Sequence, residues 1–193
     1  MPEAGRVVAG TARGIRLLAP GEGTRPLADR VKQTLFAILE AESLGPWPVP
    51  FLDLYAGSGA AGIEALSRGA ERAVFVERDV RAAAVIGQNL ERTGLDGGRV
   101  VRADVSRFLE RDPPSEGAPF GAVLVDPPYG DAAILAALER LGGTGRGWLS
   151  TGAVVVAKHF WRDALPDRVA RLSKARDRRF GETNLSFYTV EES

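Results

Sequence analysis

The fold is decided by the stretch Asp53-Leu54-Tyr55-Ala56-Gly57-Ser58-Gly59-Ala60-Ala61-Gly62, in a chain of 193 residues. It completes a strand that we predict at 51–55, and its last residues open a helix predicted at 59–68. Glycines at 57, 59 and 62 permit a tight turn and a close approach of a ligand to the backbone. Because free N–H groups and the helix dipole attract a negative group at such a turn, the stretch predicts a nucleotide-like binding site.

Strands and helices alternate regularly from residue 50 onward. The strands are predicted at 51–55, 73–77, 99–103, 121–126 and 153–157, and the helices at 59–68, 80–93, 105–110 and 131–141. Continuous apolar strands with helices between them are typical of a parallel sheet covered on both faces. Segments 169–172 and 185–190 have no strong helix between them, which predicts an antiparallel hairpin at the end of the chain.

Residues 1–27 are predicted to form an extension within a single domain, 1–193. Two short strands, 6–10 and 14–18, are expected to pair as a hairpin. After a loop, Asp29 is expected to cap a helix over 30–42, where an apolar stripe alternates with polar residues.

Composition excludes several kinds of chemistry. The chain has no cysteine and one histidine, so a disulfide framework, a thiolate or histidine metal centre and a serine–histidine triad are not expected. The start is not that of a signal peptide and no apolar run reaches the length of a membrane span, so we expect a cytoplasmic protein without a membrane or metal partner. Any reaction must then depend on carboxylates, amides and a cofactor.

Acidic residues stand where the second and third predicted strands end. Glu77 lies 18 positions after Gly59, the spacing of a carboxylate that binds ribose hydroxyls, and Asp104 is placed to meet an adenine amino group. Both also have a simpler interpretation, because either could cap the helix that follows it.

Two cofactors compete for this site, NAD and S-adenosylmethionine. Asp53 would repel a pyrophosphate but can hydrogen-bond the ammonium of a methionine, directly or through water, which favours S-adenosylmethionine. The residues that we predict to bind this donor are Asp53, Tyr55, Ala56, Gly57, Ser58, Gly59, Glu77, Arg78, Asp104, Val105 and Asp126.

A second motif, Asp126-Pro127-Pro128-Tyr129, follows the apolar run 122–125. Its two prolines exclude both helix and continued sheet pairing, so they fix an extended turn beside the donor. The Asp126 carboxylate and a backbone carbonyl can hold a planar amino group while Tyr129 stacks on the attached ring. We therefore predict Asp126, Pro127, Pro128 and Tyr129 as the catalytic residues of a reaction on an exocyclic amine.

These motifs resemble those of the amino-methyltransferase group of S-adenosylmethionine-dependent enzymes. The N-terminal part is similar to the RsmD-type family of bacterial 16S ribosomal RNA guanine-N2 methyltransferases. That similarity is carried by Arg6-Val7-Val8-Ala9-Gly10, Arg13-Gly14, Thr24-Arg25-Pro26, Asp29–Phe36 and Gly62–Ala70.

The resemblance implies a Rossmann-like α/β fold with a seven-stranded mixed sheet, whose last strand lies antiparallel between strands five and six. It also implies methylation of guanine N2 in 16S ribosomal RNA, within a small-subunit particle or assembly intermediate. One departure is Ala157–Trp161, which replaces an expected acidic segment. His159 and Trp161 within it are interpreted as packing or surface residues.

Basic residues gather near both ends of a chain with zero net charge. From the first cluster we predict contacts with RNA phosphates by Arg6, Arg13, Arg16, Arg25, Arg30 and Lys32. The second cluster, in 162–179, is the alternative docking surface, and either cluster can instead be an ordinary solvated face. Two other functions stay open: DNA adenine or cytosine methylation, and non-catalytic RNA binding on a methyltransferase fold.

Overall fold

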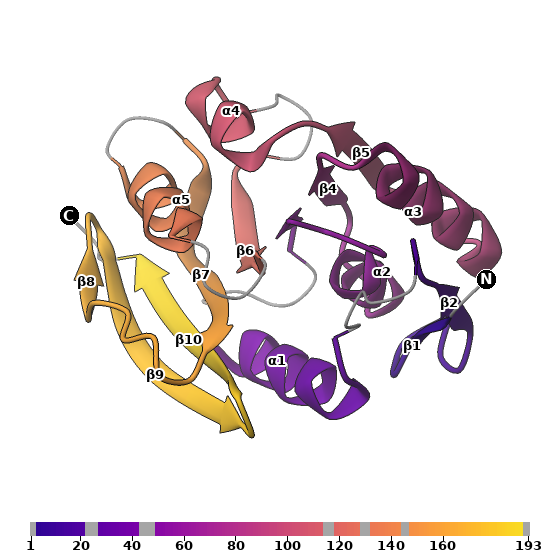
Figure 1. Ribbon diagram of the computed structural model, residues 1–193, viewed down its shortest axis with the longest axis horizontal. Coiled ribbons are helices and arrows are strands. Elements are labelled where there is room, and N and C mark those ends of the chain that lie inside the picture. The colour runs from indigo at the N-terminus through magenta and orange to yellow at the C-terminus, as the bar shows by residue number, and fades with distance from the viewer. Residues whose placement is uncertain are drawn as a thin grey trace.

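A computed structural model describes residues 3–21, 27–42, 49–113, 118–127, 132–143 and 147–190. Figure 1 shows one large sheet with helices against it and a small N-terminal hairpin at one side. The helices are α1 (Asp29–Glu42), α2 (Ala60–Ser67), α3 (Val80–Thr93), α4 (Val105–Glu110) and α5 (Ala133–Gly142). None of the helices in these ranges is long and apolar enough to cross a membrane.

The large sheet has the strand order β5-β4-β3-β6-β7-β10-β9-β8. Its strands are β3 (Phe51–Leu54), β4 (Ala73–Glu77), β5 (Gly98–Arg102), β6 (Phe120–Val125), β7 (Leu149–Phe160), β8 (Arg168–Val169), β9 (Leu172–Phe180) and β10 (Thr183–Val190). Strands β3 to β7 pair in parallel, and β10 lies antiparallel between β7 and β9. The predicted Rossmann-like mixed sheet is confirmed, with eight strands among the described residues where seven were predicted.

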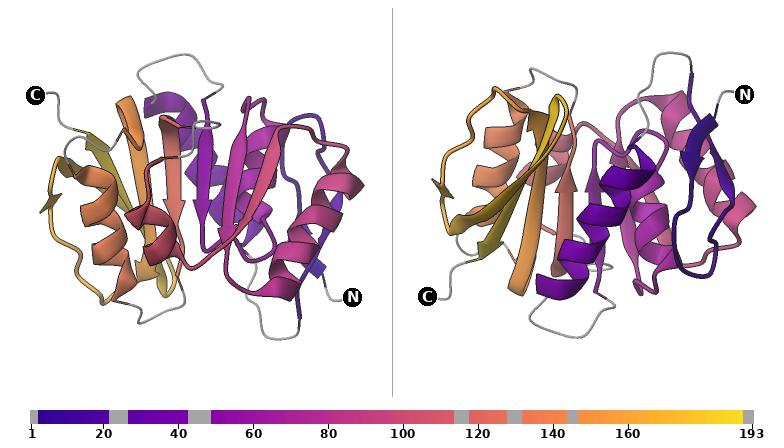
Figure 2. Two further views of the ribbon diagram at one scale, coloured as in Figure 1. Left: turned by 90° about the horizontal axis from the view of Figure 1, so that it is seen from above. Right: turned by 90° about the horizontal axis from the view of Figure 1, so that it is seen from below.

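Both faces of the sheet are covered, as the two views of Figure 2 show. Helices α1, α2 and α3 and the N-terminal hairpin pack on one face, and α4 and α5 pack on the other. The central strands bury every side chain, because each of their faces meets a helix layer. Parallel pairing therefore brings the carboxyl ends of β3, β4, β5 and β6 to one edge of the sheet.

The predicted antiparallel hairpin at the end of the chain is confirmed, but its first strand has different bounds. Segment 169–172 was expected to be one strand, but Val169 ends β8 and Leu172 begins β9, with Ala170 between them at a φ of 50°. The partner of β10 is β9, whose residues from Ala175 to Arg179 are exposed. An exposed strand does not need apolar residues, so its charged sequence concealed it.

The N-terminal hairpin also differs from the prediction. The paired strands are β1 (Glu3–Arg6) and β2 (Arg16–Leu18) rather than 6–10 and 14–18. The buried Glu64 of α2 accepts hydrogen bonds from the N–H groups of Val8 (2.7 Å) and Ala9 (2.9 Å), so these groups do not pair with a strand. The hairpin is thus fastened to α2 by a carboxylate.

Helix α1 begins at Asp29 itself, so the prediction that Asp29 caps a helix at 30–42 is wrong in this detail. The Asp29 carboxylate instead pairs with Arg6 (Nε–Oδ2 3.1 Å) and with Lys32 (Nζ–Oδ1 3.4 Å). The contact with Arg6 joins the start of α1 to β1.

We expect Gly10→Ala to lower the free energy of unfolding by at least ~2 kcal/mol. Gly10 has a φ of 82°, and an added Cβ would lie 1.7 Å from the backbone oxygen of Ser67. Gly14→Ala is the matched control, because Gly14 has a similar φ of 88° with nothing within 4 Å of the added Cβ. Urea unfolding of both variants separates the clash from the backbone strain, and equal losses would show that the hairpin does not dock closely on α2.

Candidate active site

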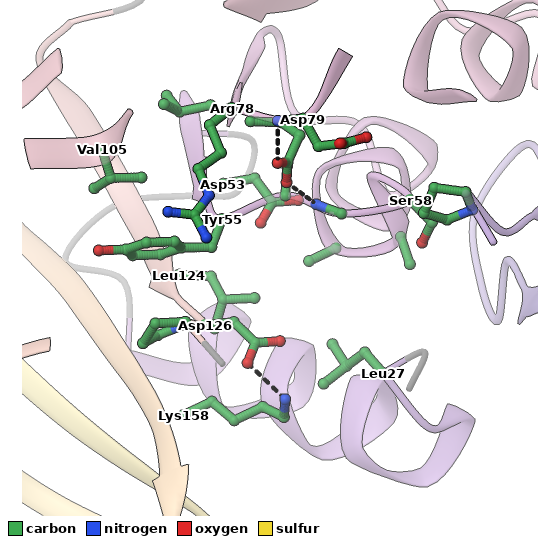
Figure 3. A pocket seen from close by; sticks show the side chains of 18 of the residues that line it. Leu27, Asp53, Tyr55, Ser58, Arg78, Asp79, Val105, Leu124, Asp126 and Lys158 are labelled. Atoms are coloured by element: carbon green, nitrogen blue, oxygen red, sulfur yellow. Dashed lines mark hydrogen bonds and ion pairs between the residues drawn. The ribbon is translucent and has the colours of Figure 1, made fainter. Parts of the chain in front are cut away.

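A cavity of about 740 Å³ opens at the carboxyl ends of the parallel strands. Its wall includes residues of the glycine turn, of the ends of β4, β5 and β6, and of the N-terminal segment. The N-terminal contributors are Ala4, Pro20 and Leu27, which sequence reasoning did not include. Figure 3 shows Asp126 and Lys158 together on one side of this cavity, with Arg78 and Asp79 on the other.

Gly57 and Gly59 form a tight turn between β3 and α2, as predicted, whereas the positive φ of Tyr55 and the packing role of Gly62 were not predicted. Tyr55, Gly57 and Gly59 have positive φ angles of 63°, 57° and 77°. Gly62 serves helix packing, because a Cβ there would lie 2.2 Å from the Phe75 ring of β4. Tyr55, Ala56, Gly57 and Ser58 all line the cavity, and α2 begins directly after Gly59.

Glu77 holds the glycine turn in place. Its Oε2 accepts a hydrogen bond from the N–H of Gly57 (2.9 Å), and its Oε1 accepts one from the N–H of Asp79 (2.8 Å). The alternative that Glu77 caps α3 is wrong, because Asp79 is the cap and accepts from Arg81 and Ala82. A carboxylate has about four acceptor sites, so Glu77 retains capacity for ligand hydroxyls at the cavity wall.

Asp104 does cap the helix that follows it, as its simpler interpretation predicted. Its Oδ1 accepts hydrogen bonds from Ser106 N (3.0 Å) and Arg107 N (3.3 Å). Within the described ranges its Oδ2 has no hydrogen bond, and both Asp104 and the buried Val105 line the cavity. The capping role therefore leaves one oxygen available to a ligand.

Asp53 is a buried carboxyl group at the base of the cavity, 2% exposed. The pKa of Asp53 is raised to about 8, mainly by desolvation; the hydrogen bond from Gly62 N (2.9 Å) opposes this shift, and the charges of Asp126 and Glu77 contribute to it. A cationic ligand would bind favourably beside this carboxyl group, because a nearby positive charge stabilises the ionised form of the carboxyl.

Asp126 follows β6 and forms an ion pair with Lys158. The Asp126 N–H donates to the carbonyl of Leu54 (3.3 Å), and the distance between Asp126 Oδ1 and Lys158 Nζ is 2.5 Å. Burial raises the pKa of Asp126 above its usual value, and the Lys158 ammonium opposes this effect. The pair places an anion and its counter-ion in the cavity wall.

Lys158 is a site residue that sequence reasoning missed. Its role becomes visible only in the strand register, in which Val125 of β6 pairs with Ala157 of β7. Asp126 and Lys158 are the next residues on these parallel neighbours, so they come side by side. Lys158 also lies in the segment where the sequence departs from the RsmD-type pattern.

The rest of the predicted catalytic motif is described only in part. Pro127 is buried and lines the cavity beside Asp126. Pro128 and Tyr129 lie outside the described residues, as does Arg25 from the predicted RNA contacts.

The predicted RNA-binding residues do not form one surface. The Lys32 prediction is wrong, because its side chain is fully buried and its ammonium donates to the Arg6 carbonyl. Arg6 pairs with Asp29, and Arg16 pairs with Glu3 (2.6 Å). These carboxylates offset the charge of two of the guanidinium groups that were expected to meet phosphates.

Arg13 and Arg30 are exposed, but they lie at different ends of the domain. Arg13 is in the hairpin turn that docks on Ser67 at the far end of α2, about 12 Å along an eight-residue helix from the glycine turn. Arg30 is in the first turn of α1, three residues after the cavity-lining Leu27. Arg30 is therefore the better placed of the two for a substrate in the cavity.

His159 is a packed residue, as predicted. It is 4% exposed, and its ring nitrogens lie 2.8 Å from Ser186 Oγ and 2.9 Å from the Phe160 carbonyl. Trp161 is on the surface.

A glycine turn held by an acidic residue after β3, beside Asp126 and Pro127 at the end of the neighbouring strand β6, defines a Rossmann-like methyltransferase. The model of the family described as "Conserved hypothetical protein 95" matches residues 5–189. The chain belongs to this family, the RsmD-type methyltransferases that its N-terminal motifs resemble.

Known proteins agree with this assignment. "Ribosomal RNA small subunit methyltransferase D" of Escherichia coli K12 is 32% identical over 192 residues, which cover 96% of this chain and 90% of that protein. A solved structure of a Thermus thermophilus protein has 34% identity and a TM-score of 0.78, over 97% of this chain and 99% of that one. The rRNA methyltransferase aviRa of Streptomyces viridochromogenes shares the fold alone, with 17% identity, a TM-score of 0.66 and coverage of 88% and 87%.

Proposed function

We propose that the chain transfers a methyl group from S-adenosylmethionine to the exocyclic N2 amino group of a guanine in 16S ribosomal RNA. The observation that carries this proposal is the meeting of Asp126 and Pro127 with the glycine turn in one cavity wall. The name of the Escherichia coli relative, which specifies the small ribosomal subunit, supports the substrate.

The residues of the cavity match the parts of the proposed donor. Asp53 is suited to the ammonium group, Glu77 to the ribose hydroxyls, and the open Oδ2 of Asp104 to the adenine amino group. When bound, S-adenosylmethionine supplies a methyl group activated by its sulfonium. Glu77 also fixes the turn that bears these contacts, so it prepares the site before a donor arrives.

Asp126 acts on the acceptor. The lone pair of a guanine amino group is delocalised into its ring, which makes it a weak nucleophile. Hydrogen bonds from this amine to the Asp126 carboxylate and the Pro127 carbonyl favour a pyramidal nitrogen, and positioning then contributes most of the acceleration. Asp126 accepts the proton that the amine releases after transfer, and the Lys158 ammonium favours the ionised carboxylate by lowering its pKa.

Labelled donor distinguishes this function from its alternatives. In separate reactions the protein and the labelled donor are incubated with unmodified 16S RNA, free and in small-subunit particles, and with unmethylated DNA. The digested nucleosides are then separated, and donor binding is measured by calorimetry. We expect label in N2-methylguanosine. Label in adenine or cytosine of DNA would favour the DNA methyltransferase alternative, and failure to bind the donor would favour a non-catalytic RNA-binding protein.

Donor affinity is expected to rise with pH up to about pH 8. The pKa of Asp53 is raised to about 8 in the free protein, so below that pH an ammonium ligand must displace a proton to meet a carboxylate. The gain approaches, at most, about tenfold per pH unit below 8. Calorimetry in two buffers with different ionisation enthalpies measures the released proton. Asp53→Asn is the control and should bind weakly without this pH dependence, whereas pH-independent binding to the unaltered protein would contradict the role of Asp53.

A further inference from the structure

An exposed aromatic and basic cluster lies where β7 and β9 end and β10 begins. Phe160 of β7 pairs with Thr183 of β10, which pairs with Phe180 of β9. Trp161 follows β7 and donates its N–H to the Glu182 carbonyl in the β9–β10 turn (3.0 Å). We define the tryptophan–arginine cluster as Trp161, Arg162 and Arg179.

The cluster lies beside the mouth of the proposed active site. Lys158, in the cavity wall, precedes Trp161 by three residues, a distance of about 10 Å along an extended strand. Both views of Figure 2 place the β9–β10 turn at the same end of the molecule as the start of β1, where Ala4 lines the cavity. An RNA strand with its target nucleotide in the cavity would therefore pass within reach of the cluster.

Trp161 holds two guanidinium groups at its ring. The Cζ of Arg179 is 3.7 Å from the ring centroid, and the Cζ of Arg162 is 4.9 Å from it, although Trp161 remains 36% exposed. Arg179 is held further by a hydrogen bond from its Nε to the Gly181 carbonyl (2.9 Å). Its two terminal nitrogens have no hydrogen bond within the described ranges, so the group is oriented while its strongest phosphate donors stay available.

The charge around the cluster fits a polyanion. Residues 158–182 contain eight basic and four acidic side chains, although the whole chain is neutral. Two of the acids, Asp167 and Asp177, lie near Lys174 (2.8 and 3.8 Å). Asp163 and Glu182 stay beside the cluster, but they do not balance the arginines of β9 and its neighbours.

We propose that the tryptophan–arginine cluster binds the sugar–phosphate backbone of the substrate RNA next to the methylated nucleotide. This inference rests on the proposed function, since it assumes RNA as the substrate. Arginine edges bind phosphate oxygens, and an exposed tryptophan adds an amphipathic surface against sugar or base. The N-terminal hairpin is less suited to this role, because Arg6 and Arg16 are paired and Arg13 is remote.

The test compares two variants with a matched control. The first variant combines Arg162→Gln with Arg179→Gln, and the second is Trp161→Ala. The control is Arg92→Gln, in the exposed last turn of α3. We expect the double variant to raise the KM for small-subunit particles and the Kd for free 16S RNA about tenfold, without changing kcat or donor affinity. In the double variant, the slope of log RNA affinity against log salt concentration should become shallower by about one to two units. Trp161→Ala should raise KM less, since the arginines remain but lose their orientation.

The other outcomes separate a failure of the proposed function from a failure of the docking inference. If the unaltered protein transfers no methyl to either RNA substrate, the proposed function itself fails. If it methylates RNA and the double variant behaves like Arg92→Gln, the docking inference fails while the function stands. A loss that occurs with particles but leaves binding to free RNA unchanged would assign the cluster to a ribosomal protein, and would also overturn the inference.

Discussion

Replacing Asp126 with alanine is expected to reduce methyl transfer by about 10²- to 10⁴-fold, a much larger loss than its effect on donor affinity, to which Asp126 is one of several predicted contributors. The carboxylate lies in the cavity wall directly before Pro127, where the acceptor amine is expected to bind. Its loss removes both the hydrogen bond that orients the amine and the acceptor for its proton. Single-turnover rates and calorimetric donor binding measure the two effects separately.

Two controls protect this prediction from a folding artefact. Alanine leaves the Lys158 ammonium without its partner, so thermal unfolding of each variant must be recorded. Asp126→Asn keeps the size and one oxygen acceptor but cannot take a proton, so it should retain more of the amine orientation than alanine does. A rate within a few-fold of the unaltered protein in either variant would remove Asp126 from the proposed centre.

The central part of the fold was predictable because its strands are buried on both sides. Segments such as 73–77 and 121–126 are continuous apolar runs, and β4 (Ala73–Glu77) and β6 (Phe120–Val125) lie within one residue of the predicted limits. The acidic residues at the strand ends were found for the same reason, because a charged residue is easily recognised at the end of an apolar run. Burial, however, does not decide between ligand binding and capping, as Glu77 and Asp104 show.

The edge of the sheet was harder to predict. Strand β9 contains Arg176, Arg178 and Arg179 on an exposed surface, so no hydrophobic alternation marks it. Lys158 was missed because its importance arises from the register between β6 and β7. A single sequence gives the ends of strands within a few residues, whereas a contact between neighbouring strands depends on their exact alignment.

The N-terminal extension shows how long-range contacts escape a local interpretation. The motifs 6–10 and 62–70 supported the resemblance separately, and the structure joins them through Glu64 and Ser67. Asn89 of α3 adds a second link, because it bonds both carbonyl and N–H of Leu18 and also the Ser58 carbonyl of the glycine turn. The extension is therefore part of the cavity wall, a role that the prediction of RNA contacts alone did not include.

Replacing Lys158 with methionine is expected to move the acidic limb of the pH–rate profile to higher pH. Burial raises the pKa of Asp126 and the Lys158 ammonium opposes that rise, so removal of the ammonium raises this pKa further. The reaction needs the ionised carboxylate as an acceptor. Activity is therefore lost from the acidic side, by about tenfold for each pH unit below the displaced limb.

Lys158→Arg provides the control that separates charge from packing. Arginine retains a cation beside Asp126, so its acidic limb should stay close to that of the unaltered protein even if the altered shape lowers the maximal rate. In Lys158→Met, activity should recover at high pH, because hydroxide restores the carboxylate that lysine had kept ionised. Recovery at high pH is the result that a merely structural lysine does not predict. A uniform loss across the whole pH range in Lys158→Met would show that Lys158 positions the Asp126 side chain without controlling its protonation.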